Sequence, residues 1–302
     1  MSDFFQTLGQ VLRAEQIRVR EPMSRHTTFR AGGPADYYVE PETRQELAAV
    51  LDLCRQWGMP YYILGNGSNL LVGDKGYRGV MVALGKPWAE VEAEGCKIRA
   101  GAGALLSAAA RLALKENLTG MEFASGIPGT VGGAVVMNAG AYGSELSDVL
   151  GQVMALTPEG QVQRFSSAEL ELGYRTSCVC SRRYVVLEAE FILSVGEGAA
   201  IRQRMEELAA RRRARQPLEY PSAGSTFKRP PGYFAGKLIQ EAGLSGFSVG
   251  DAQVSEKHCG FVINRGEAAA SDILMVCREV QSRVLEYSGV ELELEVKLLG
   301  DF

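Results

Sequence analysis

Residues 125–134, with the sequence SGIPGTVGGA, constrain the fold of this chain more than any other segment. They contain four glycines, one proline and two hydroxyl residues. Proline fixes φ, and glycine adopts dihedral angles that other residues avoid. The segment therefore predicts a stiff, pre-shaped loop with exposed backbone N–H groups. The alternative is a structural bend packed against a neighbouring strand.

Another glycine-rich loop, residues 65–69 (GNGSN), comes first in chain order and follows the apolar run 61–64 (YYIL). Glycines after a buried strand allow several N–H groups to point at one anion. The loop does not match a mononucleotide P-loop, and it does not open a helix, because residues 70–72 (LLV) continue as an apolar run. Two such loops can hold a diphosphate from two sides. A tight turn between strands remains the alternative.

Apolar residues recur at helical spacing in residues 43–57, with Thr43 as the N-cap and Gly58 at the C-terminal end. Strands predicted at 36–39 and 61–64 complete a βαβ unit. The pattern predicts further helices at 105–118, 200–215 and 271–287, and strands at 80–84, 96–99, 152–156, 161–165, 184–193 and 290–298. This order is typical of an α+β protein, with a domain boundary near residues 194–198.

The composition argues against several classes of function. A net charge of −4 gives no broad electrostatic grip on nucleic acid. The arginine run at 211–215 is expected to be the solvated end of a helix. No stretch approaches the roughly 20 apolar residues that span a bilayer. Residues 1–16 are typical of a short amphipathic helix, not of a signal peptide.

The six cysteines include no CxxC pair. Cys178 and Cys180 form the only close pair, which we expect to alternate across a strand or loop and not to hold a metal. Scattered thiols without a secretion signal indicate a reducing compartment. The expectation is therefore a cytoplasmic protein without a metal site.

Only two histidines are present, His26 and His258. This count excludes a histidine-based triad or a histidine-rich metal site, and each is expected to be an ordinary polar residue. Any proton transfer must then use another group. Candidates are Ser225, which has small neighbours, Arg175, which could pair with an anion, and Glu295.

Glu295 lies in the alternating stretch 290–297 (VELELEVK). Alternation places the apolar residues on one face and the charged residues on the other. A solvated charged face is the ordinary interpretation. Serines and arginines taken singly are likewise more often ordinary surface or structural residues than catalytic ones.

Several blocks, in the same order along the chain, resemble the UDP-N-acetylenolpyruvoylglucosamine reductases. The longest, residues 122–142 (EFASGIPGTVGGAVVMNAGAY), is the most specific. The others are residues 27–36, 65–71, 173–175, 223–228, 235–239 and 252–258. The resemblance covers nearly the whole chain.

The resemblance implies an α+β fold with an FAD-binding module of the vanillyl-alcohol-oxidase (PCMH) type in two subdomains, residues 1–80 and 81–198. Residues 199–302 would form an α+β substrate-binding domain. The enzyme would be a monomer or weak dimer that binds a UDP-sugar, and neither nucleic acid nor a membrane. It would use FAD, with NADPH as reductant, to reduce an enolpyruvyl group during peptidoglycan precursor synthesis.

The resemblance also implies roles for individual residues. Arg175 and Glu295 would stabilise an enolate-like intermediate, and Ser225 would return a proton to it. Hydride chemistry belongs to the cofactor, so the protein supplies orientation and electrostatics. The implied cofactor-binding residues are Arg30, Gly65, Asn66, Gly67, Ser68, Asn69, Ser125, Gly126, Gly129, Thr130 and Gly133. The implied substrate-binding residues are Tyr174, Lys228 and Lys237.

Some positions depart from the family pattern. Arg229 and His26 stand where asparagine is more usual, and Cys259-Gly260 replaces Ala-Asn. The chain also resembles the shorter form of the family, which lacks a tyrosine-bearing loop over the substrate. Another FAD-dependent oxidase or dehydrogenase of the same superfamily is the alternative enzyme, and a binding protein that has lost catalysis is the alternative without chemistry.

Overall fold

The computed structural model describes residues 3–302, which form two compact units. Unit 1 comprises residues 3–18, Tyr37–Asn66 and Gly79–Arg211. Unit 2 comprises Val19–Asp36, Gly67–Arg78 and Arg212–Phe302. Each unit has its own buried apolar core. The chain passes between the units several times, so neither unit is one continuous stretch of sequence.

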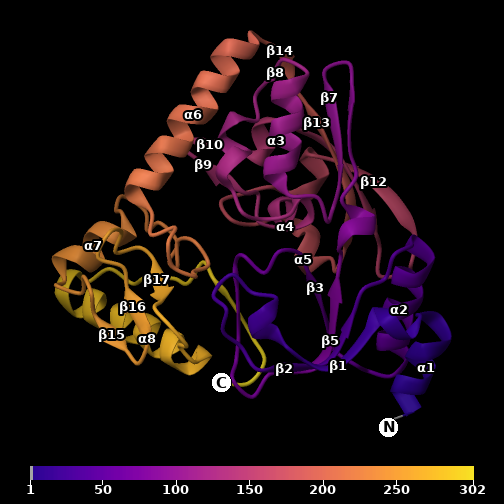
Figure 1. Ribbon diagram of the computed structural model, residues 1–302, viewed down its shortest axis with the longest axis horizontal. Coiled ribbons are helices and arrows are strands. Elements are labelled where there is room, and N and C mark those ends of the chain that lie inside the picture. The colour runs from indigo at the N-terminus through magenta and orange to yellow at the C-terminus, as the bar shows by residue number, and fades with distance from the viewer. Residues whose placement is uncertain (1–2) are drawn as a thin grey trace. The chain divides into compact units, whose positions relative to one another are not determined.

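The largest sheet of unit 1 is antiparallel and has the strand order β12-β11-β13-β7-β6. Helices α3 (Leu106–Lys115) and α4 (Val131–Val136) pack against it (Figure 1). Three alanines of α3 are buried, which allows close approach to the sheet. The strands are β6 (Val91–Glu94), β7 (Lys97–Gly101), β11 (Leu150–Leu156), β12 (Val162–Ser166) and β13 (Val185–Ile192).

A four-stranded sheet has the order β1-β2-β5-β3, and its strand β3 (Tyr61–Leu64) runs parallel to β5 (Tyr77–Ala83). Strands β1 (Ile17–Pro22) and β2 (Pro34–Val39) complete it. Helices α1 (Asp3–Val11) and α2 (Arg44–Gln56) contact each other. Thr43 begins α2 as predicted, because its hydroxyl accepts a hydrogen bond from the Glu46 N–H at 3.1 Å.

Unit 2 contains the antiparallel sheet β15-β16-β17 and the long helix α8 (Ala270–Ser288), which packs against that sheet. Its strands are β15 (Ser248–Val249), β16 (Ala252–Val254) and β17 (Val262–Asn264). Helix α7 (Ala235–Glu241) contacts α8, and β4 (Leu70–Val72) pairs in parallel with β18 (Lys297–Leu299).

The remaining elements are short, apart from helix α6 (Gly198–Arg215), whose last turn carries the arginine run. They are α5 (Cys178–Ser181), β8 (Leu118–Thr119), β9 (Gly140–Ala141), β10 (Ser144–Glu145) and β14 (Ser194–Val195). The 3₁₀ helices are Ala14–Gln16, Met23–Arg25, Lys86–Trp88, Glu122–Gly126, Leu146–Asp148 and Ala168–Leu170. No helix among residues 3–302 is long and apolar enough to cross a membrane.

Most predicted elements are present, and two predictions are wrong. Cys178 and Cys180 lie in the short helix α5, not in a strand or loop. The predicted strand at 290–298 is a strand only over Lys297–Leu299, with one isolated bridge between Leu294 and Phe227. Alternating burial within this segment is present nevertheless, since Leu292 and Val296 are buried. The N-terminal helix begins at Asp3, and residues 1–2 lie outside the described part of the chain.

Candidate active site

The two glycine-rich loops touch each other within unit 1. The Asn66 side-chain amide donates a hydrogen bond to the Pro128 carbonyl oxygen at 2.7 Å. A Cβ at Gly65 would collide with the hydroxyl of Thr130, so only glycine fits there without a shift. Among residues 3–302, no hydrogen bond is made by the backbone N–H groups of Asn66, Gly129 or Thr130. Such a set of unsatisfied donors around a small-residue contact fits a diphosphate group.

Neighbouring positions of the second loop are held by local hydrogen bonds. The Ser125 hydroxyl donates to the Glu122 carbonyl oxygen at 2.8 Å. The Thr130 hydroxyl accepts from the Gly133 N–H at 3.5 Å and caps α4. Gly126 is half-buried and Gly133 is exposed. The loop is therefore pre-shaped by its own contacts, as the sequence predicts.

In unit 2, the first loop continues with Gly67, which is buried and has a φ of 59°. A Cβ there would collide with the His26 carbonyl oxygen. The Gly67 carbonyl oxygen accepts a hydrogen bond from the Thr28 N–H at 3.2 Å. Ser68 is half-buried, whereas Arg30 is exposed and has a φ of 54°. Glycine at position 67 thus fixes how the loop packs on residues 26–28.

Asn69, the last residue of the loop, is joined to the segment that leads into β18. Its side-chain amide donates to the Glu295 carbonyl oxygen at 3.1 Å. Its own carbonyl oxygen accepts from the Lys297 N–H at 3.0 Å. The residue that the sequence assigns to cofactor binding therefore also contacts the backbone of a candidate catalytic residue.

Arg175 lies in a tight turn of unit 1, closed by the bridge between Gly173 and Thr176. Its guanidinium donates to the Gly140 carbonyl oxygen at 3.0 Å and lies 5.4 Å from the centre of the Tyr174 ring. Its φ of 54° is uncommon for a residue with a side chain. Strain of this kind is often found where a side chain must be held for function.

Asn138 is a residue of this region that the sequence analysis did not single out. It is fully buried. Its amide donates to the Gly173 carbonyl oxygen at 3.1 Å, and its side-chain oxygen accepts from the Ser147 N–H at 3.0 Å. Asn138 thereby holds the turn that carries Arg175. Its position within the most specific block, residues 122–142, is the one sequence signal that could have marked it.

Ser225 and Glu295 lie on adjacent backbone segments of unit 2. Phe227 pairs with Leu294 in an antiparallel bridge, and the Glu295 N–H donates to the Thr226 carbonyl oxygen at 2.9 Å. The antiparallel pairing therefore places Thr226 opposite Glu295, and the segment that carries Ser225 runs alongside the segment that carries Glu295. The serine is exposed and the glutamate is half-buried. Arg175 belongs to unit 1, whereas these two residues belong to unit 2.

Thr226 anchors this arrangement from below the surface, since it is only 1% exposed. Its hydroxyl accepts from the Val262 N–H at 2.9 Å, and its own N–H donates to the Gly260 carbonyl oxygen at 2.9 Å. The segment that carries Ser225 is thus fixed to strand β17 through a buried side chain.

The two candidate substrate-binding lysines each pair with a different carboxylate. The Lys228 ammonium pairs with the Glu293 carboxylate at 2.8 Å, and this bond lowers the pKa of Glu293. Lys237 lies on α7 and its ammonium is 3.6 Å from the Glu241 carboxylate. Tyr174, the third candidate, is 52% exposed.

Both histidines have ordinary local partners. His258 accepts a hydrogen bond on Nδ1 from the Gly260 N–H at 3.1 Å, and burial lowers its pKa. His26 Nε2 lies 2.9 Å from the Glu21 carboxylate. Within residues 3–302, no group of three or more His, Cys, Asp or Glu side chains could hold a metal ion.

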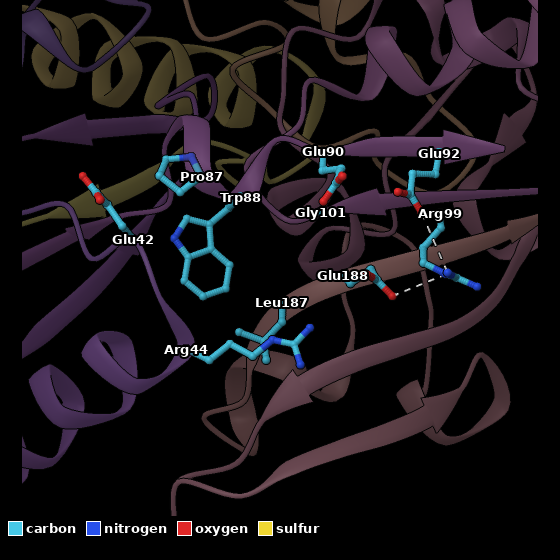
Figure 2. A pocket seen from close by; sticks show the side chains of 10 residues that line it. All are labelled: Glu42, Arg44, Pro87, Trp88, Glu90, Glu92, Arg99, Gly101, Leu187 and Glu188. Atoms are coloured by element: carbon cyan, nitrogen blue, oxygen red, sulfur yellow. Dashed lines mark ion pairs between the residues drawn. The ribbon is translucent and has the colours of Figure 1, made fainter.

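A hollow of unit 1 contains none of the candidate site residues. Figure 2 shows Arg99 between Glu92 and Glu188, with ion-pair distances of 4.0 and 3.7 Å. The Trp88 indole N–H donates to the Pro41 carbonyl oxygen at 2.7 Å. The lining is completed by Glu42, Arg44, Pro87, Glu90, Gly101 and Leu187. Its four carboxylates outnumber its two guanidinium groups, those of Arg44 and Arg99.

Family models match two parts of the chain. Residues 35–166 match an FAD binding domain, and residues 216–299 match the UDP-N-acetylenolpyruvoylglucosamine reductase C-terminal domain. The donors around Asn66 and Thr130 lie within the first match and fit the diphosphate of FAD. The fold and this site define an FAD-dependent oxidoreductase with an FAD-binding module of the vanillyl-alcohol-oxidase (PCMH) type, which confirms the predicted α+β fold class.

Whole-chain relatives narrow this class. UDP-N-acetylenolpyruvoylglucosamine reductase of Agathobacter rectalis is 54% identical over 93% of this chain and 93% of the relative. The Clostridium perfringens enzyme of that name is 50% identical over 99% and 98%. The Thermus caldophilus reductase structure has a TM-score of 0.82 at 38% identity, over 94% of this chain and 99% of that one. The chain belongs to the UDP-N-acetylenolpyruvoylglucosamine reductase family.

A more distant structure supports the fold alone. The grass-pollen glucose dehydrogenase Phl p 4.0202 has a TM-score of 0.52 at 13% identity, over 65% of this chain and 45% of that chain. The similarity covers only part of either protein. It indicates a shared fold and carries no information on the substrate of this chain.

Proposed function

We propose that this chain reduces the enolpyruvyl group of UDP-N-acetylenolpyruvoylglucosamine to give UDP-N-acetylmuramate, with FAD as cofactor and NADPH as reductant, during peptidoglycan precursor synthesis. Sequence identities of 54% and 50% to two UDP-N-acetylenolpyruvoylglucosamine reductases, over nearly their full length, support this choice of substrate. The observation that carries the chemistry is the pairing of the Ser225 and Glu295 segments through Thr226.

FAD binding in this proposal uses the contact between the two glycine-rich loops. The N–H groups of Asn66, Gly129 and Thr130 would hold the diphosphate, and glycine at position 65 would keep the contact close. When bound, FAD takes two electrons from NADPH and supplies them to the substrate as hydride. The remaining implied contacts, from Arg30 and from residues 67–69, 125, 126 and 133, belong to the same proposal.

The protein residues would handle charge and the proton. Addition of hydride to the terminal carbon breaks the carbon–carbon π bond and leaves negative charge next to the substrate carboxylate. Arg175 and Glu295 would each stabilise that charge. Ser225 would donate its hydroxyl proton to the adjacent carbon and regain one from water. A serine can do so because the carbanionic carbon is a strong base and the site holds both atoms together.

Tyr174, Lys228 and Lys237 would contact the UDP-sugar. The exposed ion pair between Lys228 and Glu293 would open as the lysine binds a substrate phosphate, because a dianionic diphosphate is the stronger partner. The division into residues 1–80, 81–198 and 199–302, a monomeric or weakly dimeric state and a cytoplasmic location are also part of the proposal.

The experiment that tests the proposal separates the two half-reactions in Ser225→Ala. Reduction of bound FAD by NADPH should stay within twofold of the unmodified enzyme. Reoxidation by the sugar nucleotide should slow by about 10²–10⁴-fold, the usual contribution of a positioned proton donor. Ser222→Ala is a matched control in the same loop and should leave both rates unchanged. Normal reoxidation of Ser225→Ala would remove the serine from the mechanism.

A further inference from the structure

Glu295 is held at both backbone polar groups. Its N–H donates to the Thr226 carbonyl oxygen at 2.9 Å, and its carbonyl oxygen accepts from the Asn69 side-chain amide at 3.1 Å. The Asn69 carbonyl oxygen in turn accepts from the Lys297 N–H at 3.0 Å. All of these residues belong to unit 2. The backbone on each side of the Glu295 Cα is therefore fixed by a named partner.

These contacts matter because no continuous strand holds the segment. Helix α8 ends at Ser288 and strand β18 begins at Lys297. Between them, one isolated bridge at Leu294 is the sheet-like pairing that the described residues show. Burial of Leu292 and Val296 anchors the apolar face but does not fix the rotation of each peptide group. The direction of the Glu295 side chain depends on individual hydrogen bonds, since Cβ follows the backbone.

We propose that Asn69 is a positioning residue for Glu295, acting through the peptide bond between residues 295 and 296. The first glycine-rich loop would then have two roles. The N–H group of Asn66 would bind the diphosphate, and the side chain of Asn69 would orient Glu295. The catalytic part of this inference rests on the proposed function. A displacement of about 1 Å at a reacting group can cost on the order of 10²-fold in rate.

Asn69→Asp tests the proposal with little change of shape. The substitution replaces the donating NH₂ with an oxygen, which cannot donate to the Glu295 carbonyl. In FAD-loaded enzyme, the limiting rate of flavin reoxidation by the sugar nucleotide should fall by roughly 10–100-fold. The apparent Kd of that nucleotide and the rate of flavin reduction by NADPH should stay within about threefold. A variant that only lost folding would slow flavin reduction and flavin reoxidation alike.

A second readout does not depend on activity. The ¹³C resonance of the Glu295 carboxyl carbon, assigned by its loss in Glu295→Gln, should titrate at a different pH in Asn69→Asp, with or without FAD. Gln253→Glu is the matched control, since it removes an amide donor from a backbone carbonyl in the same unit, that of Gly246 at 3.1 Å. It should leave the Glu295 titration and both half-reactions unchanged. Asn69→Ala repeats the test without a new charge.

The outcomes are distinct. Wild-type reoxidation together with an unchanged Glu295 titration in Asn69→Asp overturns the positioning role. Equal effects of Gln253→Glu also overturn it, because the response would then be general. If the unmodified enzyme is not reoxidised by the sugar nucleotide, the proposed function is wrong. The carboxyl titration in Asn69→Ala, which adds no charge at position 69, then decides whether Asn69 sets the environment of Glu295, with a shift supporting the role and no shift refuting it.

Discussion

Helix α8 begins with a cap that comes from far away in the sequence. The Asp74 carboxylate accepts hydrogen bonds from the N–H groups of Ala270 and Ser271 at 2.7 and 2.8 Å. The N-cap residue itself, Ala269, has a methyl side chain and cannot cap. Helices leave their first N–H groups unsatisfied, and a carboxylate there also interacts favourably with the helix dipole. Asp74→Ala should therefore destabilise the start of α8.

The expected loss is about 1 kcal/mol, within the range for removal of an N-cap side chain, because Asp74 is exposed and water replaces it in part. Local opening of α8 would become about fivefold more frequent. Hydrogen exchange of the first two turns, measured by mass spectrometry at pH 7, reports this opening directly. Asp74→Asn keeps one acceptor oxygen without the charge. Its exchange rate should therefore lie between those of the unmodified protein and Asp74→Ala.

The contribution of the Asp74 carboxylate to the free energy of unfolding depends on pH. Partial burial raises the pKa of Asp74, but hydrogen bonds from Ser271 and Ala270 outweigh it and the pKa is lowered overall. A carboxyl group with a lowered folded pKa stabilises the fold above its unfolded pKa of about 3.9 and loses that effect as pH falls through the folded value. In urea unfolding, the difference in the free energy of unfolding between wild type and Asp74→Asn should be largest near pH 7. This difference should shrink below about pH 4. If the two proteins have the same free energy of unfolding, or if the difference is constant from pH 7 to 3, the reasoning is refuted.

Two further substitutions test the site at its backbone. Gly65→Ala should weaken FAD retention, because the added methyl meets the Thr130 hydroxyl, and equilibrium dialysis of the flavin would detect this; unchanged retention would contradict the loop contact. Thr226→Val should cost about 1–3 kcal/mol by urea unfolding, since the buried Val262 N–H loses its acceptor, and Thr226→Ser should recover much of that loss if the hydroxyl is responsible.

Local signals along the chain are what the sequence allowed us to predict. Helix α2 begins at its capping threonine because the stabilising partner, Glu46, is three residues away. Gly58 has a φ of 61°, the left-handed value expected just after a helix end. The glycine-rich loops were visible because glycine and proline restrict the backbone at the positions where they stand.

Contacts between distant residues were not accessible in this way. The bond between Asn69 and Glu295 joins residues 226 positions apart, and the Asp74 cap acts across 196. The alternating stretch before Lys297 predicted a strand, but most of it has no partner strand, and alternation reports only which face is buried. Cys178 and Cys180 lie in a four-residue helix too short for a helical period to show.

The most direct test of the proposed reaction follows the visible absorbance of FAD in the unmodified enzyme under anaerobic stopped flow. Addition of NADPH should bleach the flavin, and the colour should return only after UDP-N-acetylenolpyruvoylglucosamine is added, with UDP-N-acetylmuramate as the product. Bleaching without return on addition of the sugar nucleotide would contradict the proposed substrate and favour another reaction of the superfamily. A protein that retains no flavin would contradict the use of the two glycine-rich loops as the cofactor site.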